Sequence, residues 1–188
     1  MQSQVTKFIL HGGFNSEKSD EDNSPFYIEI LKSAPQNASI LLVPFAKDAD
    51  RILPATVKVS KEFENAKSQK NLAIEVATES TLIEQIHSSN VIYFHGGVSL
   101  KLLDALKKYP DLDESLRGKI VAGESAGANV WGKYFYSPKS DTVSEGLGIL
   151  PIKICPHYKQ EYERKLDDVG IDVEELLLPE YQFKTFEK

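Results

Sequence analysis

The sequence is poor in cysteine and contains no long hydrophobic run. Cys155 is the only cysteine among 188 residues, which excludes an internal disulfide framework and indicates a reducing compartment. No apolar run approaches the roughly 20 residues that a membrane-spanning helix needs. The first residues also lack the basic and apolar segments of a secretory signal. We therefore expect a cytoplasmic protein with no membrane partner.

Positively charged residues are outnumbered by negatively charged ones. The chain has 22 Lys and Arg against 28 Asp and Glu, a formal net charge of −6, and no long basic run. Because nucleic acids bind to basic surfaces, no nucleic-acid partner is expected. The acidic stretch at residues 17–22 is expected to form a solvated loop. At 188 residues the chain is long enough to bury a substantial core, so we expect a single domain over residues 1–188. We expect it to be a monomer or a homodimer.

Short apolar runs alternate with amphipathic segments through the first two thirds of the chain. The apolar runs predict strands at residues 5–11, 38–44, 72–76, 90–94 and 119–122. The segments between them predict helices at residues 24–33, 54–66, 78–87 and 99–108, the last with Leu100, Leu103 and Leu106 on one side. This alternation predicts an α/β fold in which a parallel sheet carries helices on both faces.

Glycines follow three of the predicted strands, at residues 12–13, 96–97 and 123–127. Since ligands bind beyond the carboxyl ends of parallel strands, we expect these glycines to lie together on one functional edge of the sheet. The last third of the chain predicts a short strand at 152–155, a charged helix at about 160–168 and a last strand at 173–178.

The third glycine segment, Gly-Glu-Ser-Ala-Gly at residues 123–127, has the Gly-x-Ser-x-Gly pattern of a nucleophile elbow. It follows a predicted strand and precedes a segment that can begin a helix, which is the setting in which the pattern exposes a serine hydroxyl. Ser125 is therefore the candidate nucleophile. On the pentapeptide alone, an ordinary glycine-rich turn between a strand and a helix remains an equal alternative.

A serine nucleophile needs a base, and the base needs an acid to orient it. His157 follows a predicted strand end and a proline, which suits a base, whereas His87 near a helix end is interpreted as structural. Glu180 follows the last predicted strand and is the candidate acid. Asp141 and Glu145, between the serine and the histidine, are the alternatives.

The oxyanion of an acyl-transfer intermediate needs two backbone N–H donors. Ala126, directly after the serine, can supply one, and Gly97 or its neighbour Gly96 can supply the other. A zinc site formed by Cys155, His157 and His95 is disfavoured because paired-ligand spacing is missing. No metal or cofactor is therefore expected.

Five segments together resemble the peptidase E (alpha-aspartyl dipeptidase) family, to which cyanophycinase is a more distant relative. They come in the family's order and approximate spacing over nearly the whole chain, at residues 94–97, 123–129, 146–151, 155–158 and 178–180. The resemblance implies a flavodoxin-like three-layer sandwich similar to class I glutamine amidotransferases. It also implies a Ser-His-Glu triad of Ser125, His157 and Glu180, with oxyanion donors at Gly97 and Ala126.

The sequence differs from this family at the positions that contact substrate in the family. The family usually has Asn after the paired glycines, whereas this chain has Val98. The dipeptidase also has a basic residue that helps to hold the aspartyl side chain, for which Arg164 or Lys165 is the candidate here, and Gly96 is a further candidate substrate contact. The resemblance therefore supports the triad in this chain, but it does not support the family's preference for aspartate.

These patterns lead to three hypotheses. The first is a serine peptidase that hydrolyses dipeptides or short peptides near the amino terminus, with Asp-X dipeptides as candidate substrates. The second is an esterase or other acyl hydrolase, against which the position of Glu180 after His157 argues, since α/β-hydrolases place the acid between serine and histidine. The third is a catalytically inactive family member that binds a ligand.

Overall fold

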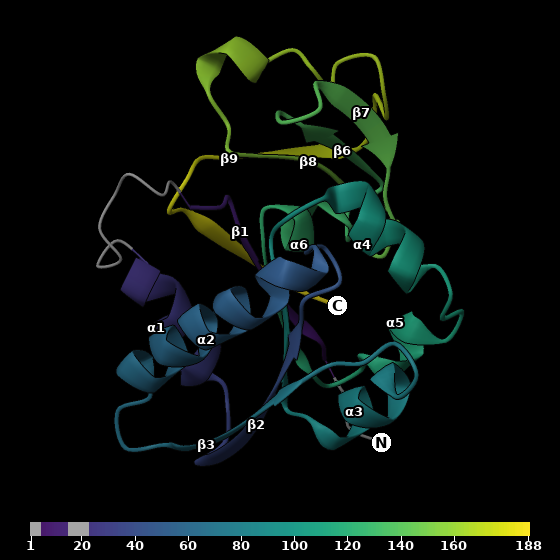
Figure 1. The fold of residues 1–188 in the computed structure, drawn as a ribbon. Helices are drawn as coiled ribbons and strands as arrows, with labels where there is room; N and C mark the ends of the chain where they lie inside the picture. The colour runs from purple at the N-terminus through teal and green to yellow at the C-terminus, as the bar shows by residue number, and fades with distance from the viewer. Residues whose placement is uncertain (1–4, 15–22) are drawn as a thin grey trace.

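A six-stranded sheet forms the centre of the computed structural model, which describes residues 5–14 and 23–188. The strand order is β10-β1-β5-β4-β2-β3 (Figure 1). The strands are β1 (Lys7–His11), β2 (Asn37–Val43), β3 (Asn71–Val76), β4 (Val91–Phe94), β5 (Ile120–Glu124) and β10 (Phe183–Glu187). All neighbouring pairs are parallel except β1 with β10. The acidic stretch at 17–22 lies outside the described residues.

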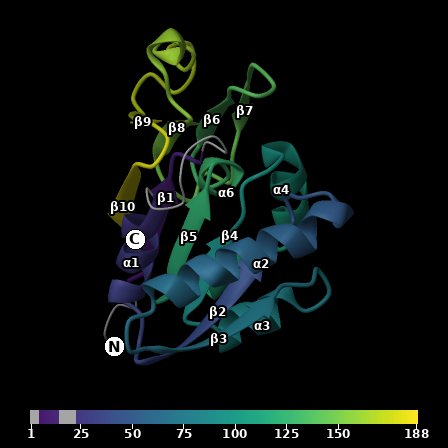
Figure 2. The same cartoon turned by 60° about the vertical axis from the view of Figure 1, so that its left-hand side comes forward.

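Helices cover both faces of this sheet (Figure 2). One face carries α1 (Ser24–Lys32) and α2 (Ala49–Ala66), and the other carries α3 (Leu82–Ser88), α4 (Ser99–Leu106), α5 (Leu112–Ser115) and α6 (Ala126–Asn129). Successive strand residues alternate between the two cores, so Phe8 and Leu10 pack with the second group of helices while Ile9 packs with the first. The predicted α/β class with helices on both faces is confirmed.

A second sheet lies beyond the carboxyl ends of β1, β5 and β4, in the upper part of Figure 1. Its order is β7-β6-β8-β9, with β6 (Tyr134–Ser137), β7 (Thr142–Glu145), β8 (Ile152–Pro156) and β9 (Glu174–Leu178). Residues Phe135 and Ile154 of this sheet share one apolar core with Trp131 and with the main sheet. The end of β8 is thereby held beside the end of β1.

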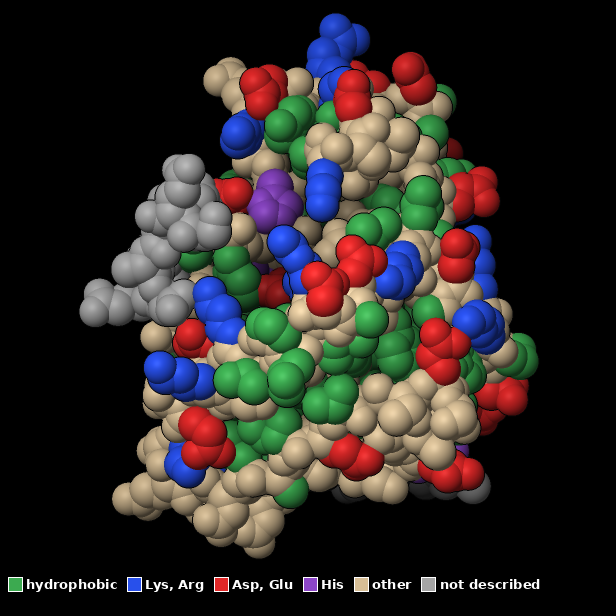
Figure 3. Space-filling model, in the orientation of Figure 1, with side chains coloured by type: hydrophobic (Ala, Val, Ile, Leu, Met, Phe, Trp, Pro, Cys, Tyr) green, Lys and Arg blue, Asp and Glu red, His purple; other side chains and the backbone are tan. Residues whose placement is uncertain are grey.

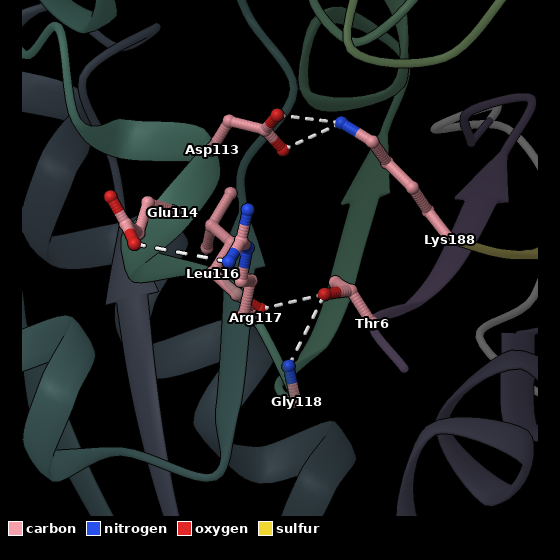
Figure 4. Close-up of polar contacts among 7 residues, drawn as sticks. All are labelled: Thr6, Asp113, Glu114, Leu116, Arg117, Gly118 and Lys188. Atoms are coloured by element: carbon pink, nitrogen blue, oxygen red, sulfur yellow. Dashed lines mark hydrogen bonds and ion pairs between the residues drawn. The ribbon is translucent and has the colours of Figure 1, made fainter. Parts of the chain in front are cut away.

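Polar contacts at the opposite end of the main sheet fix the two chain-terminal strands (Figure 4). The Thr6 hydroxyl donates to the Leu116 carbonyl at 3.0 Å and accepts from the Gly118 N–H at 3.3 Å. Lys188, after β10, binds both carboxylate oxygens of Asp113 at 2.8 and 2.6 Å. These contacts anchor the start of β1 and the end of β10 to the segment around α5. The antiparallel ladder with β1 sets the register of β10, so the turn before β10 lies at the glycine-rich edge.

Several elements differ from the sequence predictions. The helix predicted at 54–66 begins at Ala49, with Pro54 inside it. Strands β6, β7 and β10 were not predicted, and on α4 the side chain of Leu100 is 47% exposed. Among the described residues, no helix is long and apolar enough to cross a membrane.

The charged helix predicted at 160–168 is wrong. Only a 3₁₀ turn forms there, at Gln160–Tyr162. The buried ammonium of Lys153 donates to the Leu166 carbonyl at 2.9 Å and to the Val169 carbonyl at 3.4 Å. These carbonyls are thus satisfied by a side chain from β8, and Leu166 packs into a small core with Cys155. Tertiary contacts therefore outweigh the local helix pattern.

Candidate active site

Ser125 lies in a sharp turn between β5 and α6. Its φ of 51° is in the region that L residues avoid, and its N–H donates to the His11 carbonyl at 3.0 Å. The flanking glycines permit this turn, because a Cβ added to Gly123 would lie 2.1 Å from the Gly127 carbonyl oxygen. A Cβ on Gly127 would lie 2.1 Å from the Phe94 carbonyl oxygen. The turn therefore has the geometry expected of a nucleophile elbow.

His157 follows directly after β8 and reaches across to the end of β1. Its N–H donates to the Gly12 carbonyl at 2.7 Å, and its own φ is 53°. The imidazole lies so close to Gly13 that a Cβ at that position would be 2.3 Å from Nε2. Nε2 lies 3.0 Å from the Ser125 hydroxyl, a hydrogen-bond distance.

Glu180 completes a chain of side-chain contacts with these residues. It lies in the turn between β9 and β10, and its Oε1 is 3.0 Å from His157 Nδ1. The next residue, Tyr181, donates its N–H to the Gly13 carbonyl at 3.1 Å, which fixes this turn against the end of β1. The alternative acid Asp141 is instead bound by the Tyr136 hydroxyl and by Lys165, each at 2.7 Å.

The side chains of His157 and Glu180 are 29% and 27% exposed, so a substrate can reach them from solvent. In Figure 3 a histidine side chain reaches the surface between the second sheet and the helices of the main layer. The arrangement is therefore an accessible site in which an imidazole contacts a hydroxyl on one side and a carboxylate on the other.

Two backbone N–H groups are available beside the hydroxyl. Within the described part of the chain, neither the Gly97 N–H nor the Ala126 N–H has a hydrogen-bond partner. Gly97 has a φ of 153°, and a Cβ there would lie 2.3 Å from the Ala46 carbonyl oxygen, so this loop requires glycine. The Gly96 N–H is already used, because it donates to Glu124 Oε1 at 3.1 Å. The structure thus gives no support to Gly96 as a polar substrate contact through its N–H.

Glu124 is a residue whose role the sequence analysis missed. Its side chain is buried directly before Ser125, and burial raises the pKa of its carboxyl above the usual value. By accepting the Gly96 N–H it ties the end of β5 to the loop that carries Gly97. In the sequence, a charged residue at the end of an apolar strand could have indicated that Glu124 has a structural role.

Arg164, the candidate contact for an acidic substrate, is directed elsewhere. Its side chain is 89% exposed and pairs with Asp167 at 3.0 Å. Lys165 pairs with Asp141. Nothing in these contacts supports a substrate role for either residue. Cys155 is buried, and burial raises the pKa of its thiol to about 12, which disfavours a thiolate nucleophile.

Two buried histidines, His11 and His95, flank the site. His11 and His95 are fully buried, and burial is the main cause that lowers the pKa of each imidazole from 6.5 to about 3. The Gly13 N–H donates to His11 Nδ1 at 3.0 Å, which favours the neutral ring. In the described part of the chain, neither ring nitrogen of His95 has a partner.

We expect the free energy of unfolding to fall as the pH is lowered from 6.5 towards 3. In this window the unfolded chain protonates His95 while the folded chain does not, so the stability present above pH 6.5 is lost by about 1.4 kcal/mol per pH unit for this histidine. His95→Leu removes that contribution. Urea unfolding at pH 7.5, 6 and 5 should therefore give a shallower pH dependence for the variant than for the natural chain.

His87→Gln is the matched control for this measurement, because His87 is exposed on α3. Its pH dependence should equal that of the natural chain. Equal slopes for His95→Leu and the natural chain would contradict the assignment of acid sensitivity to His95. Glu124 acts with the opposite sign, since a raised carboxyl pKa favours the folded state at low pH. The comparison between variants cancels this contribution.

The family model and the similar solved structures indicate the same family of proteins. The family model for peptidase family S51 matches residues 8–170. A crystal structure of a candidate peptidase E protein from Listeria monocytogenes EGD-e is similar with a TM-score of 0.67 and 18% identity, covering 98% of both chains. A peptidase from an acI-B1 Actinobacterium is similar with a TM-score of 0.61 and 18% identity, covering 90% of this chain and 78% of that one. No curated protein matches the sequence significantly.

The fold and the family model together define the class of protein. The three-layer arrangement is that of peptidase E proteins, a flavodoxin-like fold similar to class I glutamine amidotransferases. The chain belongs to peptidase family S51. The resemblance stated from the sequence is thereby confirmed, and the coarse class of activity is that of a peptidase.

Proposed function

We propose that this protein is a serine peptidase that hydrolyses dipeptides or short peptides near the amino terminus through a Ser-His-Glu triad. The observation that carries the proposal is the continuous contact from the Ser125 hydroxyl through His157 to Glu180, with both distances 3.0 Å. This geometry is that of a nucleophile, a general base and an orienting acid. Membership of a peptidase family supplies the class of bond that is cleaved.

The three residues of the triad act in turn in this mechanism. His157 Nε2 takes the proton of the Ser125 hydroxyl as its oxygen attacks the peptide carbonyl, and the same nitrogen then protonates the leaving amine. Glu180 accepts the Nδ1–H of His157, which selects the productive tautomer and stabilises the imidazolium. Water, activated by His157, then hydrolyses the acyl-enzyme.

The negative charge that develops on the carbonyl oxygen would be stabilised by the N–H groups of Gly97 and Ala126. Loss of one such donor typically costs about 3 kcal/mol of transition-state stabilisation. The rigid loop geometry at Gly97, which leaves no room for a Cβ, supports this role because the donor is fixed before substrate binds. No step in this mechanism needs a metal or a cofactor.

The test is a panel of dipeptides combined with a serine-directed fluorophosphonate. Asp-Leu and Asp-Ala are compared with Leu-, Lys- and Ala-led dipeptides, and the labelled residue is identified by mass spectrometry. Labelling at Ser125 together with cleavage of any dipeptide supports the serine peptidase, and cleavage confined to the aspartyl members would assign an Asp-X dipeptidase. A folded protein that is neither labelled nor active would instead support the inactive, ligand-binding alternative.

A further inference from the structure

A pocket of about 230 Å³ opens beside the loop that carries Gly97. It lies between the start of α4 and the β6–β7 hairpin, and we call it the hairpin pocket. Gly97, Val98 and Leu100 line it on one side, and Phe135, Lys139 and Thr142 line it on the other. A cavity of about 150 Å³ is enough to hold benzene, so the hairpin pocket can accommodate a leucyl or phenylalanyl side chain.

The position of this pocket relative to Ser125 follows from the strand order. Ser125 follows β5, which lies between β1 and β4. His157 lies over Gly13 at the end of β1, whereas Gly97 follows β4 on the other side. The base and the hairpin pocket therefore lie on opposite sides of the nucleophile.

This arrangement decides which part of a peptide the pocket can hold. In acyl transfer the base gives its proton to the leaving amine, so the leaving group lies on the side of the base. The residue that supplies the attacked carbonyl must extend to the other side, which here is the side of β4 and Gly97. If Gly97 donates to the carbonyl oxygen, a pocket lined by Gly97 itself is next to the side chain of that residue.

The lining favours an apolar side chain. Val98 and Leu100 are apolar yet 43% and 47% exposed, and the buried Phe135 also borders the pocket. Four hydroxyl residues border it too, Ser99, Ser137, Ser140 and Thr142, but Ser99 is bonded to Asn129 and Ser140 to Thr142. Covering the apolar part of this surface with an apolar group is favourable by about 25 cal/mol per Å². The Val98 side chain also offers no hydrogen bond to a polar substrate group.

Among the described residues that line the pocket, Lys139 is the one that carries a charge, and it is exposed on the hairpin turn. It lies within electrostatic range of Asp48. A hydrogen bond from Lys101 is the main cause that holds the pKa of the Asp48 carboxyl below its usual value, and Lys139 contributes a smaller effect in the same direction. Asp48 is exposed and already paired with Lys101 at 3.0 Å, so it offsets little of the Lys139 charge, and an acidic side chain is the competing occupant that the experiment must exclude.

We propose that the hairpin pocket binds the side chain of the residue whose carbonyl is attacked, and that it selects an apolar side chain such as Leu, Met or Phe. This inference rests on the proposed serine peptidase function and specifies its substrate class. It predicts that Leu-led and Phe-led peptides are better substrates than Asp-led or Ala-led ones.

The preference can be measured with diphenyl α-aminoalkylphosphonates, which carry one substrate-like side chain. The Ser125 oxygen forms a bond to phosphorus, the bond from phosphorus to one phenoxy group breaks, and the serine proton leaves with the phenol. We expect the isobutyl and benzyl compounds to label Ser125 at least about tenfold faster than the methyl and carboxymethyl compounds, as side-chain complementarity of this size usually allows. Equal rates, or a fastest reaction with the carboxymethyl compound, would overturn the inference.

Thr142→Trp tests whether the hairpin pocket itself is responsible, because the indole would occupy the space between the hairpin and α4. We expect the isobutyl-to-methyl rate ratio to fall to near one. Val143→Trp is the matched control: Val143 is the adjacent residue of β7, is exposed, and does not line the pocket. Its ratio should equal that of the natural chain, and an unchanged ratio in Thr142→Trp would also overturn the inference.

A fluorophosphonate without a substrate side chain separates the two levels of the proposal. If it labels Ser125 while the phosphonate rates show no side-chain preference, the hairpin pocket inference fails and the serine peptidase stands. If it does not label Ser125 in the folded protein, the serine peptidase fails and the pocket inference fails with it.

Discussion

Replacing Ser125 by alanine is expected to lower kcat/KM for any cleaved dipeptide by at least about 10⁴-fold, since nucleophile removal in serine peptidases costs about that much or more. The hydroxyl lies 3.0 Å from His157 Nε2, and it is the only hydrogen-bond partner of that nitrogen among the described residues. The backbone N–H groups of Gly97 and Ala126 stay in place in the variant. Activity that remains should therefore reflect binding and the oxyanion donors alone.

The fold should tolerate Ser125→Ala. Ser125 keeps its unusual φ of 51° through glycine neighbours and backbone hydrogen bonds, neither of which the substitution removes. The free energy of unfolding should change by less than about 1 kcal/mol in urea titrations. Ser80→Ala, at an exposed serine before α3, is the control and should retain full activity. Full activity in Ser125→Ala would reject the proposed mechanism.

Glu180→Gln is expected to lower kcat by about 10³- to 10⁴-fold, because a neutral amide no longer stabilises the imidazolium and can favour the wrong tautomer of the histidine. The carboxylate contacts His157 Nδ1 at 3.0 Å, and the amide occupies nearly the same volume. KM should change much less than kcat, because Glu180 contacts the base and not the proposed substrate. Steady-state kinetics on the best dipeptide and the fluorophosphonate labelling rate both measure this effect.

Two further variants make the Glu180 result specific. Glu187→Gln removes an exposed carboxylate from β10 and should leave kcat unchanged. Glu180→Asp keeps the charge but shortens the side chain by one methylene, so it should retain more activity than Glu180→Gln. If Glu180→Gln is as active as the natural chain, another group must orient His157.

The chemistry of the site was predictable from short segments of the sequence. Ser125 could be identified because its pentapeptide follows an apolar strand, and glycine is required there by contacts that leave no room for a Cβ. His157 and Glu180 could be identified because each follows a strand end and a proline. The α/β class followed from the alternation of apolar and amphipathic segments, which depends on local periodicity.

Elements that depend on partners distant in sequence were not predictable. Strand β10 exists because it pairs with β1, and its short, mixed sequence has no strong periodicity of its own. The predicted helix at 160–168 is replaced by successive turns, and Lys153, from β8, binds the Leu166 carbonyl within this segment and the Val169 carbonyl just after it. The hydrogen bond between Glu124 and Gly96 joins the end of β5 to a loop 28 positions away in the sequence.

The sequence by itself determined the class of fold, the family and the three residues of the candidate triad, because strand periodicity is local and the motifs can be recognised from their residues and order. The need for glycine at these positions comes from tertiary contacts, such as that of Gly127 with the Phe94 carbonyl. The tertiary structure alone decided that Ser125, His157 and Glu180 lie within hydrogen-bond distance, since their approach requires β1, β5 and β8 to end at one edge. The tertiary structure also determines the existence and the position of the hairpin pocket. That pocket exists only where the unpredicted strands β6 and β7 pack near α4, on the side of Ser125 away from His157.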